Sequence, residues 1–185
     1  MPPCQLTQGY ATNCKDTIGG IVRLWLSDFG TLSSFTLDSD DQITDASGTA
    51  TFFQYDLKNA GNTLTTTVTT SRDTGTTFFS SVLALVLPKL SKELSKELKL
   101  IAYSRPYIIV ETRAGDFLFL GKDHGCELTS ATLQSGGAMG DLSGYNLEFT
   151  SEEPLQPLYI SGGTSTNPVA GLSSVTETIT VGTNS

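Results

Sequence analysis

Histidine occurs once in this chain, so His124 is the first residue to consider for acid–base or nucleophilic chemistry. It lies in the stretch Lys122-Asp-His-Gly125, where a Ser-His-Asp arrangement needs one serine and one aspartate from elsewhere in the fold. The candidates are Ser130 or Ser135 as the nucleophile, and Asp123 or Asp141 as the group that orients the imidazole. No GxSxG motif accompanies them. A polar residue in a turn between two strands is the simpler interpretation, and we expect no catalytic residue and no enzyme.

Metal-binding patterns are also incomplete. His124 and Cys126 are close in sequence, but a structural zinc site takes about four such ligands, and Cys4 and Cys14 lie far away. The acidic stretch from Asp38 to Asp45 lacks the central glycine and the closing glutamate of a calcium loop. We expect a solvated acidic turn there and no metal site.

Two further patterns have ordinary explanations. Gly136-Gly-Ala-Met-Gly140 is glycine-rich, but neither a GK[ST] motif nor a helix follows it, as a phosphate-binding loop requires. Glu152-Glu153 before Pro154 is typical of an acidic strand end. We therefore expect no cofactor.

Composition narrows the class of protein. The chain has 185 residues, of which 38% are hydrophobic and only 16% charged, with 18 glycines and many threonines and serines, which favours strands and turns. A net charge of −8 argues against a basic DNA-binding groove, although an acidic wall suits DNA that must slide past.

Three cysteines without CxxC spacing indicate reduced thiols. No signal peptide is visible, and the longest apolar run, Val82–Leu87, is too short for a bilayer, so we expect a soluble protein made inside a cell, with no membrane partner.

The elements that must position these residues are mostly strands. Residues 78–87 fit either a strand or a short helix, because Phe78, Val82 and Leu85 also suit helical spacing. The other strands are predicted at or around 21–26, 35–37, 43, 51–57, 63–70, 107–112, 117–121, 126–133 and 144–150.

One helix is predicted at about 91–103. Leu90, Leu94, Leu98 and Ile101 form an apolar stripe, Ser91 is a suitable N-cap and Pro106 ends the helix. The stripe leaves Lys92, Lys96 and Lys99 on other faces, and five of the eleven basic residues lie between Lys89 and Arg105. We expect this helix on the outside of the molecule or at an interface, facing an acidic partner.

The predicted fold class is mainly β: an antiparallel β-sandwich or small barrel with one flanking α-helix and extended arms. Residues 1–19 form an N-terminal arm, and 20–160 form the β-sandwich domain with a long loop at about 58–77. Residues 161–185 form a Ser/Thr/Gly-rich extension with a β-prone run at Val175–Val181, expected as a flexible tail or as an arm ordered against a neighbour. Arms and strands with unpaired edges indicate a subunit completed by copies of itself.

The order of elements resembles the tail tube proteins of tailed bacteriophages, particularly phages of Bacteroidetes. The resemblance covers roughly residues 14–160 and includes the predicted helix at 91–103. The remaining segments that carry it are Cys14-Lys-Asp-Thr-Ile-Gly-Gly-Ile-Val-Arg-Leu-Trp25, Ser71-Arg-Asp-Thr-Gly75, Gly115-Asp-Phe-Leu-Phe-Leu-Gly121, Gly136–Gly140, Asp141-Leu-Ser-Gly-Tyr145 and Glu152-Glu-Pro154.

Members of that family, like the inner-tube proteins of contractile injection systems, are β-sandwiches or small barrels with a flanking helix. Their stacked, usually hexameric rings close into a continuous β-barrel tube, a conduit for DNA ejection. The resemblance implies contacts with copies of this chain and with other tail proteins (tape measure, terminator, sheath or baseplate), with DNA only passing through. It implies a place in the virion tail, after assembly in the host cytoplasm.

A conduit for DNA should have a neutral or negative wall, because cationic walls bind phosphates. The candidates for an acidic lumen are Asp38, Asp40, Asp41, Glu111 and Glu148. Three alternatives remain open: another virion component such as a tail terminator, baseplate or capsid accessory protein; a carbohydrate-binding β-sandwich that uses Trp25 and tyrosines; and a hydrolase that uses His124.

Overall fold

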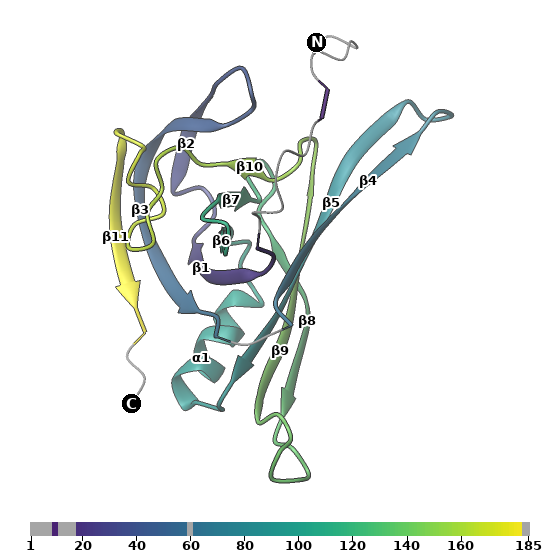
Figure 1. Cartoon of the computed structure of the whole chain (residues 1–185), viewed down its shortest axis with the longest axis vertical. Helices are drawn as coiled ribbons and strands as arrows, with labels where there is room; N and C mark the ends of the chain where they lie inside the picture. Colours follow the sequence, from purple (N-terminus) through teal and green to yellow (C-terminus); the bar gives the residue numbers. More distant parts are fainter. Residues whose placement is uncertain (1–8, 11–17, 59–60, 183–185) are drawn as a thin grey trace.

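The structure is a computed structural model that describes residues 9–10, 18–58 and 61–182, and it confirms the predicted mainly β class with one flanking helix (Figure 1). Two sheets lie against each other. The seven-stranded sheet contains β1 (Ile21–Ser27), β2 (Leu32–Leu37), β3 (Ile43–Asp56), β6 (Tyr107–Thr112), β7 (Phe117–Leu120), β10 (Leu158–Tyr159) and β11 (Val175–Val181). The four-stranded sheet contains β4 (Thr63–Ser71), β5 (Thr76–Pro88), β8 (Glu127–Gln134) and β9 (Gly144–Glu153).

The seven-stranded sheet is organised around the long strand β3. Its order is β10-β7-β6-β1-β3-β11, and β1 and β2 follow one another along the same edge of β3. Gly48 is the point where Leu32 of β2 and Val175 of β11 pair with β3 from opposite sides. The φ of Gly48 is +144°, and a Cβ there would collide with the Thr31 carbonyl oxygen, so glycine is required.

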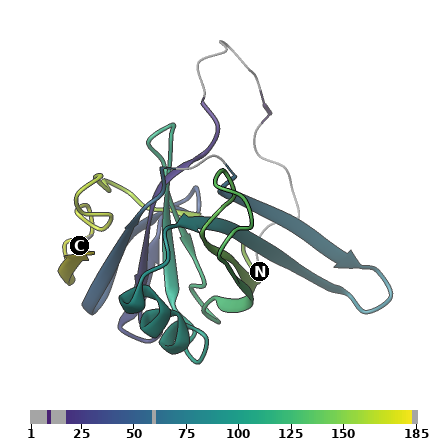
Figure 2. The ribbon, with the colours of Figure 1, turned by 90° about the horizontal axis from the view of Figure 1, so that it is seen from below.

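The four-stranded sheet has the order β4-β5-β9-β8 and is antiparallel throughout. Residues 78–87 lie within strand β5, because β5 pairs with β4 on one edge and with β9 on the other. Pairing with β9 stops at Phe79, whereas pairing with β4 continues to Thr76. The segments 68–71 and 76–79 therefore form a two-stranded projection, which we call the ribbon, and it extends away from both sheets (Figure 2).

Two apolar cores hold the sheets in place. One core lies between the sheets, and the other lies inside the curl of the seven-stranded sheet. Strand β6 supplies both: Ile108 and Val110 belong to the first core, Tyr107 and Ile109 to the second. Because side chains alternate along a strand, β6 is buried on both faces.

Helix α1 (Lys92–Ile101) confirms the predicted helix. The Ser91 side chain caps it by accepting a hydrogen bond from the Leu94 N–H at 3.0 Å. Leu94, Leu98 and Ile101 pack against the core between the sheets, while the lysines of α1 are exposed. The hydroxyl of Tyr145 on β9 donates to the Ser91 carbonyl at 3.1 Å, which joins the start of the helix to the four-stranded sheet.

The C-terminal segment belongs to the same domain. Val169, Leu172 and Val175 are buried in the core inside the curl, and β11 pairs in parallel with β3. In place of the expected tail or neighbour-dependent arm, residues 161–181 close one edge of the seven-stranded sheet. Most of the predicted arm at 1–19 lies outside the described residues. The predicted loop at 58–77 holds β4 and part of the ribbon.

Candidate functional site

The turn that carries His124 is held by a carboxylate of β9. Glu153 accepts hydrogen bonds from the backbone N–H groups of His124 at 2.9 Å and of Asp123 at 3.1 Å. Burial raises the pKa of Glu153, and these N–H groups oppose that shift. The Asp123 side chain is engaged by Lys122, whose Nζ lies 2.6 Å from Asp123 Oδ1.

Two other candidates for a catalytic triad, Ser135 and Asp141, lie away from this turn. Ser135 follows the last residue of β8 and His124 precedes the first, so the length of β8, about 25 Å, separates them. Asp141 lies in the loop beyond Ser135, where its carboxylate accepts hydrogen bonds from the N–H groups of Gly137 at 3.0 Å and Ala138 at 2.8 Å. These bonds lower the pKa of Asp141. The loop's own aspartate thus satisfies these two N–H groups.

Cys126 lies in the core between the sheets. Burial raises its pKa to about 12, which keeps the sulfur as an unreactive thiol. Cys4 and Cys14 lie outside the described residues. Within the described ranges, no three His, Cys, Asp or Glu side chains gather closely enough to hold a metal ion.

The acidic turn between β2 and β3 is exposed and self-supported. The Asp38 carboxylate accepts hydrogen bonds from the N–H groups of Asp40 and Gln42, both at 2.9 Å. Asp38, Asp40 and Asp41 are all exposed. Asp45 has a different role. Its carboxylate accepts two hydrogen bonds from Ser174, one from the backbone N–H group at 3.0 Å and one from the side-chain hydroxyl at 2.7 Å. These bonds lower the pKa of Asp45 and tie the start of β11 to β3.

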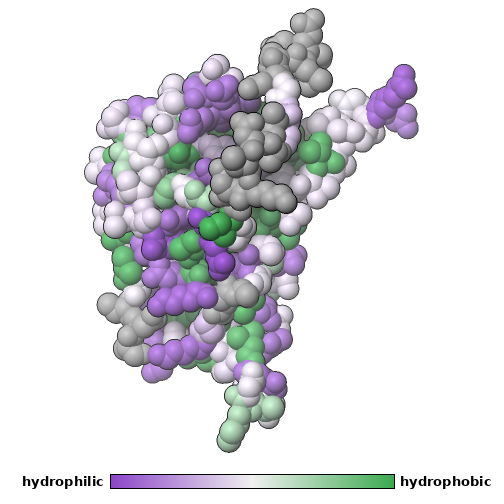
Figure 3. Space-filling model, in the orientation of Figure 1, coloured by the Kyte–Doolittle hydropathy of each residue, from purple (hydrophilic) through white to green (hydrophobic). Residues whose placement is uncertain are grey.

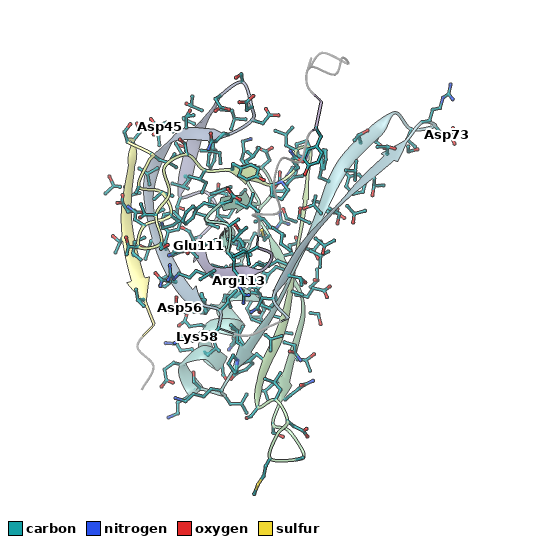
Figure 4. All side chains as sticks on the ribbon, viewed as in Figure 1. Asp45, Asp56, Lys58, Asp73, Glu111 and Arg113 are labelled. Carbon is teal, nitrogen blue, oxygen red and sulfur yellow. The ribbon has the colours of Figure 1, made fainter. Side chains whose placement is uncertain are left out.

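Glu111 is not available to line a lumen, which corrects the expectation from sequence. It is only 6% exposed, because β6 is covered on both faces. Its carboxylate lies 3.0 Å from Arg23 Nη1 and accepts a 2.6 Å hydrogen bond from the Ser165 hydroxyl. Arg23 Nε also pairs with Asp56 at 3.1 Å, and Figure 4 shows Glu111 and Asp56 close together on the seven-stranded sheet. The side chains of Arg23, Asp56, Glu111 and Ser165 thus link β1, β3, β6 and the C-terminal segment.

The four-stranded sheet has one covered and one open face. Leu83, Leu85, Leu147 and Phe149 point into the core between the sheets. The opposite face, which we call the outer face, carries alternate residues of the same strands, as the register shows. Its members are Thr63, Thr65 and Thr67 of β4; Ser80, Val82, Ala84 and Val86 of β5; Asn146, Glu148, Thr150 and Glu152 of β9; and Glu127, Ser130 and Thr132 of β8.

The strand residues of the outer face carry charge of a single sign. The four strands contain no lysine or arginine, and the charged members of the face are Glu127, Glu148 and Glu152. Glu127 is paired with Arg105 at 3.3 Å, and both side chains are more than half exposed. Glu148 is the one predicted lumen residue on this face. Glu127 and Glu152 share this face with Glu148, and the two-residue alternation that places Glu148 outwards also extends to Glu152.

Both edges of this sheet are open within the described chain. Strand β4 pairs only with β5, and β8 pairs only with β9. Nearly every side chain of β8 is exposed, and Leu133 is 59% exposed. The ribbon continues the open edge of β4, with Val68 53% exposed, and Figure 3 shows it as a mostly neutral projection with a hydrophilic tip.

Other candidate sites are small or closed. Trp25 is fully buried against Phe117, so it is not available to stack on a sugar. Two cavities have volumes of about 10 Å³ each, room for about one water molecule. No helix in the described ranges combines the length and the apolar character needed to cross a membrane. Comparison of the chain with family models, with curated proteins and with solved structures finds no match, so function is inferred from this geometry.

Proposed function

We propose that this chain is a non-enzymatic structural subunit of a phage virion that assembles into rings, and that stacked rings form the tail tube through which DNA leaves the capsid. The observation that carries the proposal is the four-stranded sheet, which within the described chain combines two open edges with an outer face to which the strands contribute no lysine or arginine. The resemblance to tail tube proteins noted in the sequence implies the same function.

The open edges support ring formation. An unpaired strand edge is a template for pairing with another chain, and in a monomer it promotes aggregation. Pairing of β4 from one copy with β8 from the next makes a heterologous contact, which closes into a ring when the rotation between copies allows it. The four-stranded sheets then form one continuous barrel. The ribbon reaches beyond its own sheet, where a two-stranded element is only marginally stable without a partner.

The outer face supports a conduit for DNA. Phosphates bind clustered lysine and arginine, and such contacts would hold DNA inside a tube. The outer face offers hydroxyl groups with Glu148 and Glu152 instead, and every copy in a ring repeats this surface. We therefore place the lumen at the outer face, with these glutamates in its wall.

The subunit acts in the virion tail after assembly in the host cytoplasm. Its main partner is itself, and tape measure, terminator, sheath or baseplate proteins are the other expected contacts. Another virion ring, such as a tail terminator, is the second candidate, because the open sheet edges support any ring.

Negative-stain electron microscopy with mass photometry tests the proposal. Wild-type protein should form rings or hollow tubes of constant bore at high concentration. Leu133→Lys places a charge on the β8 edge and should block ring closure. Thr51→Lys, the matched control, adds the same charge on an exposed position of β3 and should assemble normally. A wild-type protein that stays monomeric, or Leu133→Lys rings that match wild type, would overturn the proposal.

A further inference from the structure

An exposed row of side chains runs along α1. Lys92, Lys96, Lys99 and Tyr103 lie at positions i, i+4, i+7 and i+11, which places them on one side of the helical path. This lysine face is opposite the apolar stripe that packs on the core between the sheets. Tyr103, just beyond the helix, is 84% exposed. The helix therefore presents its positive side outwards.

No ion pair within the described part of the chain uses the charge of this face. Among the described residues, the basic partners in ion pairs are Arg23, Arg105 and Lys122, so none of the three lysines of the face is included. Lys92 and Lys96 are like charges at i and i+4, a spacing at which side chains on a helix are neighbours and like charges repel. Glu93 and Glu97 lie on one flank of the face and offset only part of its charge.

The opposite charge lies at the other end of the molecule. The acidic turn immediately precedes Ile43, where β3 begins, whereas Tyr55 near the end of β3 lines a cavity with Leu98 and Ile101 of α1. Twelve residues of extended strand span about 40 Å. Figure 1 shows the β2–β3 turn at one end of the long axis and α1 towards the other. The two surfaces cannot meet within one copy.

The two surfaces are complementary. The acidic turn exposes Asp38, Asp40 and Asp41, and no lysine or arginine occurs between Leu24 and Leu57. Contact between like ends of two copies is repulsive, whereas contact between unlike ends is attractive. A head-to-tail contact leaves one free end of each kind, so it repeats without closing.

We infer that successive rings stack head to tail because the lysine face of α1 on one copy docks on the acidic β2–β3 turn of a second copy in the next ring. This inference rests on the proposed function, and it assigns Asp38, Asp40 and Asp41 to stacking rather than to the lumen. It makes elongation dependent on ionic strength, because exposed charges are screened by salt.

A charge exchange tests this contact. Lys92→Glu with Lys96→Glu reverses the lysine face. Asp40→Lys with Asp41→Asn cancels the net charge of the turn, places a cation where Asp40 stood, keeps the Asp38 carboxylate that holds the turn, and respects the positive φ of Asp41. Each pair alone should still form rings but shorten the tubes at least tenfold, and the four changes together should recover part of the tube length, because the cation at position 40 then faces the new glutamates. Wild-type tubes should shorten between about 0.1 M and about 1 M salt, as the Debye length falls from about 10 Å to about 3 Å.

The outcomes separate the two proposals. Tubes of normal length in both pair variants, or no recovery in the combined variant whose rings are intact, would overturn the stacking contact while ring formation survives. A wild-type protein without rings would overturn both. Thermal melts followed by circular dichroism show whether each variant is folded, and a variant that fails to fold is replaced by Lys99→Glu alone, which should shorten tubes to a smaller extent.

Discussion

Arg23 is the residue on which the join between the sheet and the C-terminal segment depends. It pairs with Glu111 and Asp56, and it donates to the Ser165 carbonyl at 2.9 Å. Arg23→Met leaves the Glu111 carboxylate buried without its cation, and we expect unfolding free energy to fall by about 3 kcal/mol. Urea unfolding measures this. Adding Glu111→Gln should recover part of the loss, and a change below about 0.5 kcal/mol for Arg23→Met would contradict the role.

Cys126 should be chemically silent in the folded protein. With a pKa near 12, almost none of the sulfur is thiolate at neutral pH, and burial also blocks reagents. In a Cys4→Ser/Cys14→Ser background, alkylation by iodoacetamide should proceed only as fast as the protein unfolds, and urea should accelerate it. Labelling at the rate of a free thiol in native buffer would show that the thiol is accessible.

Glu153 gives the stability of the subunit a defined pH dependence. Its pKa is raised above the ordinary value of about 4.5, so the folded state holds this proton more tightly than the unfolded state does. The stabilisation is therefore complete below that ordinary value and is lost as pH rises through the raised pKa. Glu153→Gln keeps an oxygen for the N–H groups of the His124 turn and does not titrate. Urea midpoints should show wild type falling relative to Glu153→Gln as pH increases, and parallel curves would contradict this.

At the scale of elements, α1 offers a matched pair of leucines. Leu98 packs on the core between the sheets, whereas Leu100 is 54% exposed. We expect Leu98→Ala to reduce the free energy of unfolding by about 2 kcal/mol and Leu100→Ala to change it by less than about 0.5 kcal/mol. Denaturant titration of the two variants checks this, and equal effects would mean that the helix packs through another face.

The elements that sequence predicts well are those whose signal is local. The leucine stripe, the Ser91 cap and Pro106 define α1 within one short stretch. In contrast, the apolar residues of β5 fit both the spacing of a strand and that of a helix. Only the pairing of β5 with β4 and β9 makes this segment a strand. The β-prone run Val175–Val181 is visible in the sequence, but its partner β3 is far away in the chain, and no local signal specifies a parallel pairing.

The difference between local signals and long-range pairing also decides which residues of the candidate site can be predicted from the sequence. Alternation along β9 predicts that Glu148 faces away from the core, and the structure places it on the outer face. Glu111 is a candidate only because it is acidic, and it proves buried because β6 has a core on each side and no solvent face. The outer face as a whole is invisible in the sequence, since it joins alternate residues of strands that only the sheet order brings together.

At the scale of the whole molecule, the acidic outer face should let DNA pass. Tubes of the wild-type chain should not retain a short DNA duplex when they are pelleted. Glu148→Lys with Glu152→Lys should still form tubes, but these should retain DNA in a manner that weakens with salt. Fluorescence of labelled DNA in the pellet measures this. Equal retention by wild type would place the outer face outside the bore.

The pairing of β3 with β11 has a consequence for synthesis in the cell. Val175 pairs with Gly48, so one edge of β3 has no partner in its own sheet until β11 has left the ribosome. At about 5–20 residues per second, that interval is on the order of ten seconds. A nascent chain thus carries an unprotected strand edge while many copies are being translated side by side. We expect ribosome-bound chains that stop before β11 to be strong clients of chaperones, and expression without them to yield inclusion bodies.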